Sequence, residues 1–238
     1  MATARPPAGL ELTPAAFAGL ADASPPLFAV MLLSSAAMGY EVLLTRLFSI
    51  IQWHHFAYMM ISVALLGYGA AGTFVAVAQR ALLPRFDAVF AGGAVLFGIA
   101  AVTGFALAQR VAFNPLEILW DPQQPLRLVV IYGLLFVPFV CAASSICLAF
   151  TRFAGQPHRI YSFDILGAGA GSLGILAVLF LLTPTDALKL LGALGIAAAA
   201  LALVRGGTRS RRLAAKAFHG LSVSTRARSS VTTAPPSP

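Results

Sequence analysis

Residues 27–51 read LFAVMLLSSAAMGYEVLLTRLFSII, an apolar run longer than the stretch of about 20 residues that a helix needs to cross a bilayer. Two charged residues, Glu41 and Arg46, interrupt it within the segment 39–47. Ionisable groups at membrane depth are costly to bury and tend to mark function. The run therefore predicts a membrane-spanning helix that contains part of a polar site.

The whole chain has the composition of a multi-pass membrane protein. Of its 238 residues, 59% are hydrophobic and 10% are charged, and the mean hydropathy is +0.86. Soluble domains are about 45–50% apolar. Further apolar runs of spanning length occur at residues 56–78, 88–109, 126–150, 160–182 and 185–204. We therefore expect an all-α polytopic membrane helix bundle with six transmembrane helices in residues 27–204.

The basic residues predict how this bundle is oriented. The formal charge is +8 and the pI is near 10.3, but the basic residues are scattered over loops and a tail, which argues against nucleic acid as a partner. If the chain crosses six times, twelve Lys and Arg residues fall on the side of the termini and four on the other. Because cytoplasmic loops are enriched in Lys and Arg, we expect both termini to be cytoplasmic.

The two ends of the chain are expected to be disordered cytoplasmic segments, residues 1–26 and 205–238. The first lacks the basic patch and short apolar core of a cleaved signal peptide. The second is polar and basic, so we expect it to be disordered or to lie against anionic lipid. On the other side of the membrane, Trp53 and Trp120 are expected to anchor the interface.

Two segments, 67–72 and 169–174, match the GxGxxG pattern of dinucleotide-binding loops. That pattern binds phosphate only in a turn between a strand and a helix, where backbone amides are free. Both matches lie inside apolar runs, so we expect helix packing through small residues and no nucleotide cofactor. The glycines assigned to packing are Gly67, Gly69, Gly72, Gly167, Gly171 and Gly174.

An internal similarity accompanies these glycines. Residues 62–70 and 162–170 share five identical residues at a constant offset of 100. This pairs the second expected span with the fifth and predicts two inverted three-helix repeats, an arrangement found within each half of major-facilitator transporters. The alternative is coincidence in a chain rich in Gly, Ala and Leu, and Glu41 would align with Cys141 rather than with an acidic residue.

Glu41, Arg46 and Asp164 form the candidate intramembrane polar site. Glu41 and Arg46 are five residues apart, which is not a neighbouring position on a helix, so each is expected to need a partner on another helix. Asp164 begins the fifth span and can either pair with Arg152 or Arg159 or reach into the bundle. Two interpretations stay open: the charges lock the helices in position, or they hold a cation or a proton.

Other chemistry-bearing residues suggest no further site. Cys141 and Cys147 are interpreted as apolar packing residues. His54 and His55 are adjacent, and no Cys, Asp or Glu nearby completes a metal-ligand set. Because no Ser/His/Asp set, pair of soluble carboxylates or P-loop is present, we expect no catalytic residues and no metal site.

Three segments together resemble a known family. They are the signature GYEVLLTRL at residues 39–47, the glycine-rich second span, and YSFDILGA at residues 161–168. Residues 27–204 resemble the membrane region of bacterial membrane-bound spermidine-synthase-like proteins. The resemblance implies a partnership with a cytoplasmic domain similar to polyamine aminopropyltransferases, which has an adenosyl-cofactor site.

The segment after residue 204 departs from that family, because about 30 basic, Ser/Thr/Pro-rich residues are too few for a Rossmann-like domain. The resemblance therefore implies a membrane module that anchors or serves an aminopropyltransferase-type enzyme. Three origins stay open: a natural short form, a gene fragment with an altered reading frame, or the partner of a separately encoded enzyme. The rival interpretation is a small secondary transporter for a cationic solute such as a polyamine, acting as a homodimer. The third is a purely structural fragment. Besides the lipid bilayer, the expected partners are thus a separate synthase domain or a second copy.

Overall fold

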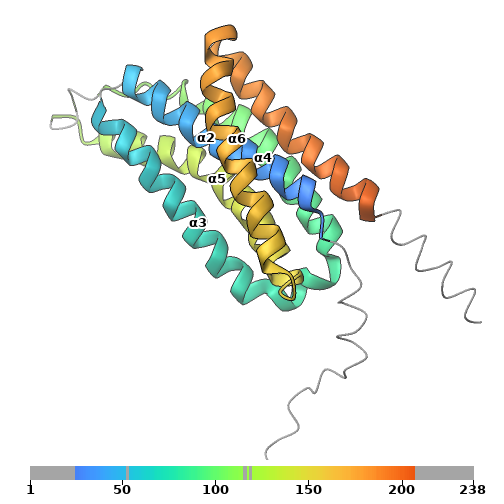
Figure 1. Cartoon of the computed structure of the whole chain (residues 1–238). Helices are drawn as coiled ribbons and strands as arrows, with labels where there is room; N and C mark the ends of the chain where they lie inside the picture. Colours follow the sequence, from blue (N-terminus) through green and yellow to red (C-terminus); the bar gives the residue numbers. More distant parts are fainter. Residues whose placement is uncertain (1–24, 52–53, 115–116, 118–119, 207–238) are drawn as a thin grey trace, which may run out of the picture.

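The computed structural model describes residues 25–51, 54–114, 117 and 120–206, and all regular structure in these residues is helical, as expected (Figure 1). The α-helices are α2 (Leu27–Ile51), α3 (His54–Leu82), α4 (Phe86–Ala108), α5 (Gln123–Arg152), α6 (Pro157–Leu181) and a further helix over Pro184–Gly206. A short 3-10 helix, η1 (Leu83–Arg85), joins α3 to α4. Trp53 and nearly all of both predicted disordered ends lie outside the described residues, as do the side chains of His54 and His55.

Five stretches of the described residues are long and apolar enough to cross a membrane. One of them, Tyr58–Ala108, has 51 residues and contains most of α3 and all of η1 and α4. The prediction of a membrane protein is supported. By this criterion the described residues contain five spans, whereas six were predicted. Pro84 lies in η1, and its missing backbone donor and fixed φ are unfavourable inside a continuous α-helix.

Helix α3 runs parallel to α5. Near the start of both helices, the Tyr132 hydroxyl donates to the Met59 sulfur at 3.1 Å. Further along both, Gly67 lies against Phe139, where an added Cβ would be 2.6 Å from the Phe139 Cβ. The matching order of these contacts shows that the two helices share a direction.

Helix α4 runs the opposite way along α5. The early residue Gly93 lies against Ser145, and the later residue Gly104 lies against the Leu134 carbonyl. Since α3 and α4 follow α5 in opposite directions, the chain turns back on itself at η1.

The helix over Pro184–Gly206 is antiparallel to α4 and returns to the end of the bundle where α2 begins. Gly192 and Gly98 lie against each other's backbone carbonyls, and Gly206 lies beside Asp87. The Arg205 guanidinium sits 5.3 Å from the centre of the Phe28 ring. We call this end of the bundle the terminal end, and the other the opposite end.

Helix α6 packs along α2 in a parallel direction, much as α3 packs along α5 (Figure 1). The rings of Phe28 and Phe163 meet edge to face at 5.4 Å near the start of both helices. Helix α3 also packs against α2, whereas α6 makes little contact with α5. As a result, α2 lies between α3 and α6.

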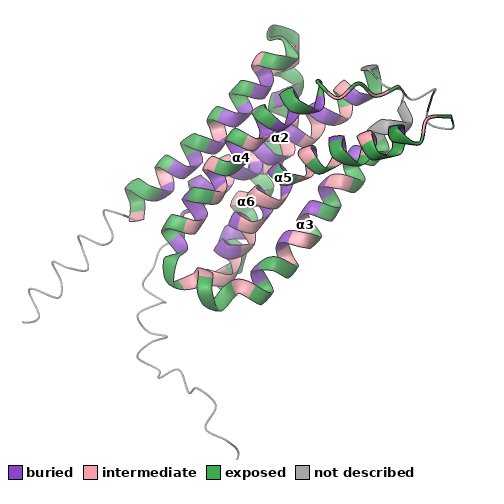
Figure 2. Cartoon of the chain, turned by 180° about the vertical axis from the view of Figure 1, so that it is seen from behind, coloured by how far each residue is buried: buried purple, intermediate pink, exposed green. Residues whose placement is uncertain are grey.

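The centre of the bundle is aromatic. Tyr40 of α2 is fully buried, and its ring lies 6.1 Å from Phe97 of α4 and 5.2 Å from Phe139 of α5. In Figure 2 the buried residues face the interior and the exposed ones cover the outward sides of the helices. Those outward sides are largely apolar, as expected for helices that meet lipid.

Candidate functional site

Glu41 lies near the middle of α2, on the same helical face as Ser34. The two residues are seven apart, which is close to two helical turns. The Glu41 carboxylate is half-buried, and the Tyr68 hydroxyl of α3 lies within hydrogen-bonding reach of it. Thr45 donates its hydroxyl to the Glu41 backbone carbonyl at 2.8 Å and does not use the carboxylate. The Glu41 side chain therefore faces α3.

Asp164 reaches into the bundle from α6. Ser34 is buried, with 4% of its surface exposed, and its hydroxyl donates a hydrogen bond to the Asp164 carboxylate. Of the basic partners considered from sequence, Arg159 instead donates to Gln156 at 3.0 Å. Of the two predicted environments for Asp164, the structure shows the interior one.

The two carboxylates lie along one side of α2, about 10 Å apart along its axis, because Asp164 contacts Ser34 and Glu41 is seven residues further on. Tyr68 interacts electrostatically with both Glu41 and Asp164, and Cys147 of α5 interacts with Asp164. We call Glu41 and Asp164 the carboxylate pair, and Ser34 and Tyr68 supply the hydroxyl groups around it. Four different helices thus contribute to this part of the bundle.

The carboxylate pair has no basic partner in the part of the chain that the structure describes. There, the ion pair that the structure shows joins Lys189 to Asp186 at 2.9 Å, on the exposed start of the Pro184–Gly206 helix. Within the same residues, no group of three or more His, Cys, Asp or Glu side chains comes together. Chemically, this part of the bundle offers two separate carboxylates, each beside one hydroxyl: Asp164 beside Ser34 and Glu41 beside Tyr68.

Arg46 lies apart from the carboxylate pair. It is exposed and lines a cavity between α2 and α6 with apolar residues, nearer the opposite end. Five residues rotate a helix by about 140° from Glu41, so the two side chains leave α2 on different faces. Of the three predicted site residues, the structure therefore places Glu41 and Asp164 toward the bundle interior, about two helical turns apart along α2, and Arg46 on another face of α2.

Glycines position the carboxylate pair. Gly167 lies against the Met31 carbonyl and Gly171 against the Ser35 carbonyl, so the backbones of α6 and α2 touch beside Asp164. Gly67 plays a similar part in α3. It contacts Phe139 of α5, and the neighbouring Tyr68 lies toward the bundle. Small residues allow this close approach in membrane helices.

The packing prediction needs correction at the other three glycines. A Cβ added at Gly69, Gly72 or Gly174 would meet no atom within 4 Å. Gly69 and Gly72 are two and five positions from Gly67, so they turn to other sides of α3, where no other described residue comes within 4 Å of an added Cβ. Only one glycine of the first match and one of the second lie at close contacts.

Sequence reasoning missed Ser34 and Tyr68. Ser34 carried a signal, since its seven-residue spacing from Glu41 places both on one face of α2. Tyr68 lies between Gly67 and Gly69, in a segment interpreted as a packing surface. A polar residue beside a contact glycine is well placed to enter a site, and this pattern could have identified it.

Comparisons with protein-family models, with curated proteins and with solved structures find no match to this chain. The interpretation of the site therefore depends on its chemistry.

Proposed function

We propose that this chain is an integral membrane module that binds a small organic cation of the polyamine class at the carboxylate pair. The observation that carries the proposal is that Glu41 and Asp164, from separate helices, both face the bundle about two helical turns apart along α2, without a basic residue beside them among the described residues. A cation with one ammonium group at each carboxylate would supply the missing charge.

The energetics favour an occupant with more than one positive charge. The effective penalty for burying an ion is several kcal/mol, and it is offset only by a well-placed partner. A polyamine carries ammonium groups separated by methylenes, so one molecule can bind two carboxylates while its carbon chain contacts apolar side chains. The hydroxyls of Ser34 and Tyr68 satisfy further lone pairs of the carboxylates.

The place of the site in the bundle suits access from the terminal end. Asp164 is the eighth residue of α6, which puts it about 10 Å from the start of that helix. The excess of basic residues on this side favours a cytoplasmic terminal end in a bacterial inner membrane. A cytoplasmic cation would then meet Asp164 first and Glu41 deeper in the membrane.

The resemblance to the membrane region of spermidine-synthase-like proteins suggests why the module would bind a polyamine. In that reading, the module anchors or serves an aminopropyltransferase-type enzyme, and the bound amine is that enzyme's substrate or product. In this proposal the membrane module supplies no catalytic group, and the chemistry belongs to an aminopropyltransferase-type synthase domain.

We further propose that α3 and α4 cross the membrane separately, giving six spans. The reversal at η1 supports this, because the two helices run in opposite directions along α5. A single 51-residue helix would extend about 75 Å, more than twice the thickness of a bilayer core.

The arrangement of the helices favours a second candidate function, a small secondary transporter. Helix α3 follows α5 as α6 follows α2, and Gly67 and Gly167 each lie at a close contact in the two cases. This is the relation that inverted three-helix repeats would produce. Such a unit would work as a homodimer, since six spans form half of a major-facilitator bundle.

The test is calorimetric titration of spermidine into the purified chain in lipid nanodiscs. Glu41→Gln and Asp164→Asn should each weaken binding about tenfold or more, which corresponds to about 1.4 kcal/mol. The matched control is Asp186→Asn, which removes an exposed carboxylate that already has Lys189 as its partner. Melting temperatures check that each variant folds. Equal affinity for the wild type and both site variants would overturn the proposal.

Uptake by proteoliposomes separates the two functions. A transporter should accumulate labelled spermidine and lose this activity in Glu41→Gln, whereas a binding module should hold spermidine without moving it.

A further inference from the structure

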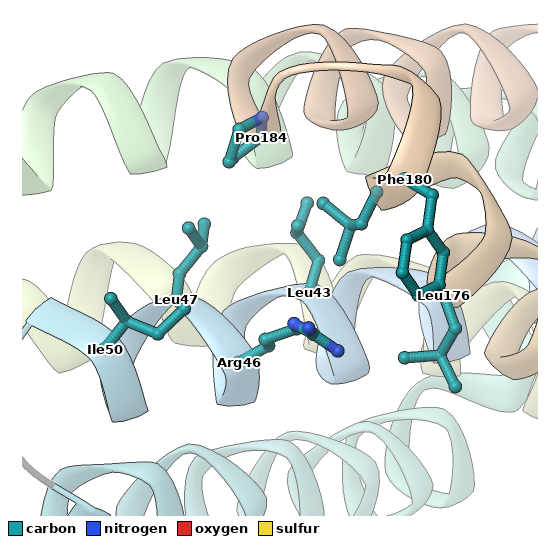
Figure 3. Close-up of a pocket in the computed structure, with 8 residues that line it drawn as sticks. Leu43, Arg46, Leu47, Ile50, Leu176, Phe180 and Pro184 are labelled. Atoms are coloured by element: carbon teal, nitrogen blue, oxygen red, sulfur yellow. The ribbon is translucent and has the colours of Figure 1, made fainter.

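The cavity that contains Arg46 lies outside the carboxylate pair and has its own chemistry. It has a volume of about 190 Å³ and lies between the later halves of α2 and α6, near the start of the Pro184–Gly206 helix (Figure 3). Its lining consists of Leu43, Arg46, Leu47, Ile50, Leu176, Leu179, Phe180 and Pro184. One cation and seven apolar residues thus share the space.

The guanidinium of Arg46 has no acidic partner among the residues that the structure describes. In Figure 3 it lies along α2 near Leu43, with Leu176 and Phe180 on the side of α6. A guanidinium has five N–H donors and stays charged at any physiological pH. An anion with several acceptor oxygens would satisfy it in a way that the apolar lining does not.

Arg46 lies near the end of α2, at the level that the lipid phosphates of a bilayer would occupy. It is five residues before Ile51, the last residue of α2, which is about 7 Å along the helix axis. Long basic side chains near helix ends extend toward the interface, so the guanidinium is within reach of lipid headgroups.

The rim of the cavity opens toward the bilayer. Ile50 and Phe180 have 73% and 84% of their surface exposed. On a membrane-spanning helix, such outward apolar side chains contact acyl chains. A ligand that enters here must therefore be apolar along most of its length and anionic at one point.

We infer that this cavity is a binding site for one phospholipid, whose phosphate is bound by Arg46 and whose acyl chain lies over Leu47, Ile50 and Phe180. Arginine binds phosphate through two parallel N–H donors, which lysine does not reproduce. The site is independent of the proposed cation site, because neither Glu41 nor Asp164 lines the cavity.

The experiment is native mass spectrometry of the purified full chain in an uncharged detergent. Three probes are added separately: short-chain phosphatidylglycerol, the matching diacylglycerol without phosphate, and inorganic phosphate. We expect one phosphatidylglycerol to be retained per chain, and little retention of the other two. Equal retention of the diacylglycerol would show that Arg46 contributes nothing, and binding of inorganic phosphate alone would show a free-anion site; either result overturns the inference.

Variants localise the binding. Arg46→Gln should lower phosphatidylglycerol retention at least tenfold, and Arg46→Lys should restore only part of it. The control is Arg110→Gln, which removes an exposed arginine at the same end of the bundle, outside the cavity. Leu47→Trp keeps the charge but fills the cavity, so it should also abolish retention. If all four variants retain as much phosphatidylglycerol as the wild type, the cavity is not the site.

Discussion

The contact between α6 and α2 provides the sharpest test of the described packing. A methyl group added at Gly171 would collide with the Ser35 backbone, including its carbonyl oxygen and carbonyl carbon. A methyl group added at Gly174, one turn along the same helix, would meet nothing within 4 Å. The same substitution, Gly to Ala, should therefore have opposite effects at the two positions.

The expected magnitudes follow from two opposing terms. Overpacking a contact costs about 1–3 kcal/mol, and the upper value applies at Gly171 because a backbone carbonyl cannot rotate away as a side chain can. Replacing Gly by Ala in a helix gains about 1 kcal/mol in propensity. Gly171→Ala should thus lose about 2 kcal/mol of unfolding free energy, and Gly174→Ala should gain up to about 1 kcal/mol.

The assay is reversible unfolding in mixed micelles with increasing dodecyl sulfate, followed by circular dichroism. The difference between the two variants should be about 3 kcal/mol. Equal unfolding free energies, within about 0.5 kcal/mol of each other, would refute the close α2–α6 contact and with it the placement of Asp164 beside Ser34.

Three other predictions concern the site, the connection between α4 and α5, and the topology. Tyr68→Phe should weaken spermidine binding about threefold to tenfold in the same titration, because it removes the hydroxyl beside Glu41; unchanged affinity would remove Tyr68 from the site. Gln124→Ala should speed proteolysis of the 109–122 connection, whereas Gln123→Ala should have little effect. The buried Gln124 amide donates to the Glu117 and Asp121 carboxylates and accepts from the Asn114 backbone N–H, at 3.2–3.3 Å. Trp120→Cys, in a cysteine-free background, should react with a membrane-impermeant maleimide added to intact cells, because this residue is 85% exposed and is predicted to lie outside; labelling only after lysis would invert the proposed topology.

The helices could be predicted from the sequence because apolar runs of spanning length leave few alternatives. The predicted and observed bounds differ by at most a few residues, for example 126–150 against Gln123–Arg152 for α5. The differences fall where polar residues such as Gln123 extend a helix beyond its apolar part. Hydropathy detects the membrane core, while hydrogen bonding decides where a helix ends.

The site was only partly predictable, for a physical reason. Burial cost alone identifies Glu41 and Asp164 as unusual, but their shared environment depends on how α2 and α6 are rotated about their own axes. That rotation is set by the contacts of Gly167 and Gly171 with the backbone of α2, which no spacing rule distinguishes from the outward position of Gly174. Arg46 was grouped with Glu41 because they are close in sequence, and the helical rotation between them separates the two side chains.

The interface between α6 and α2 has a mechanical consequence. At Gly167 and Gly171 the glycine meets a backbone carbonyl, so the register of the two helices is held by the side chains on either side, the Phe28–Phe163 ring pair and the Ser34–Asp164 hydrogen bond. A slide of one residue would shift Asp164 past Ser34 by about 1.5 Å, enough to break their hydrogen bond. The register of this contact therefore sets the separation of the two carboxylates, and any ligand that bridges them would hold the two helices at one register.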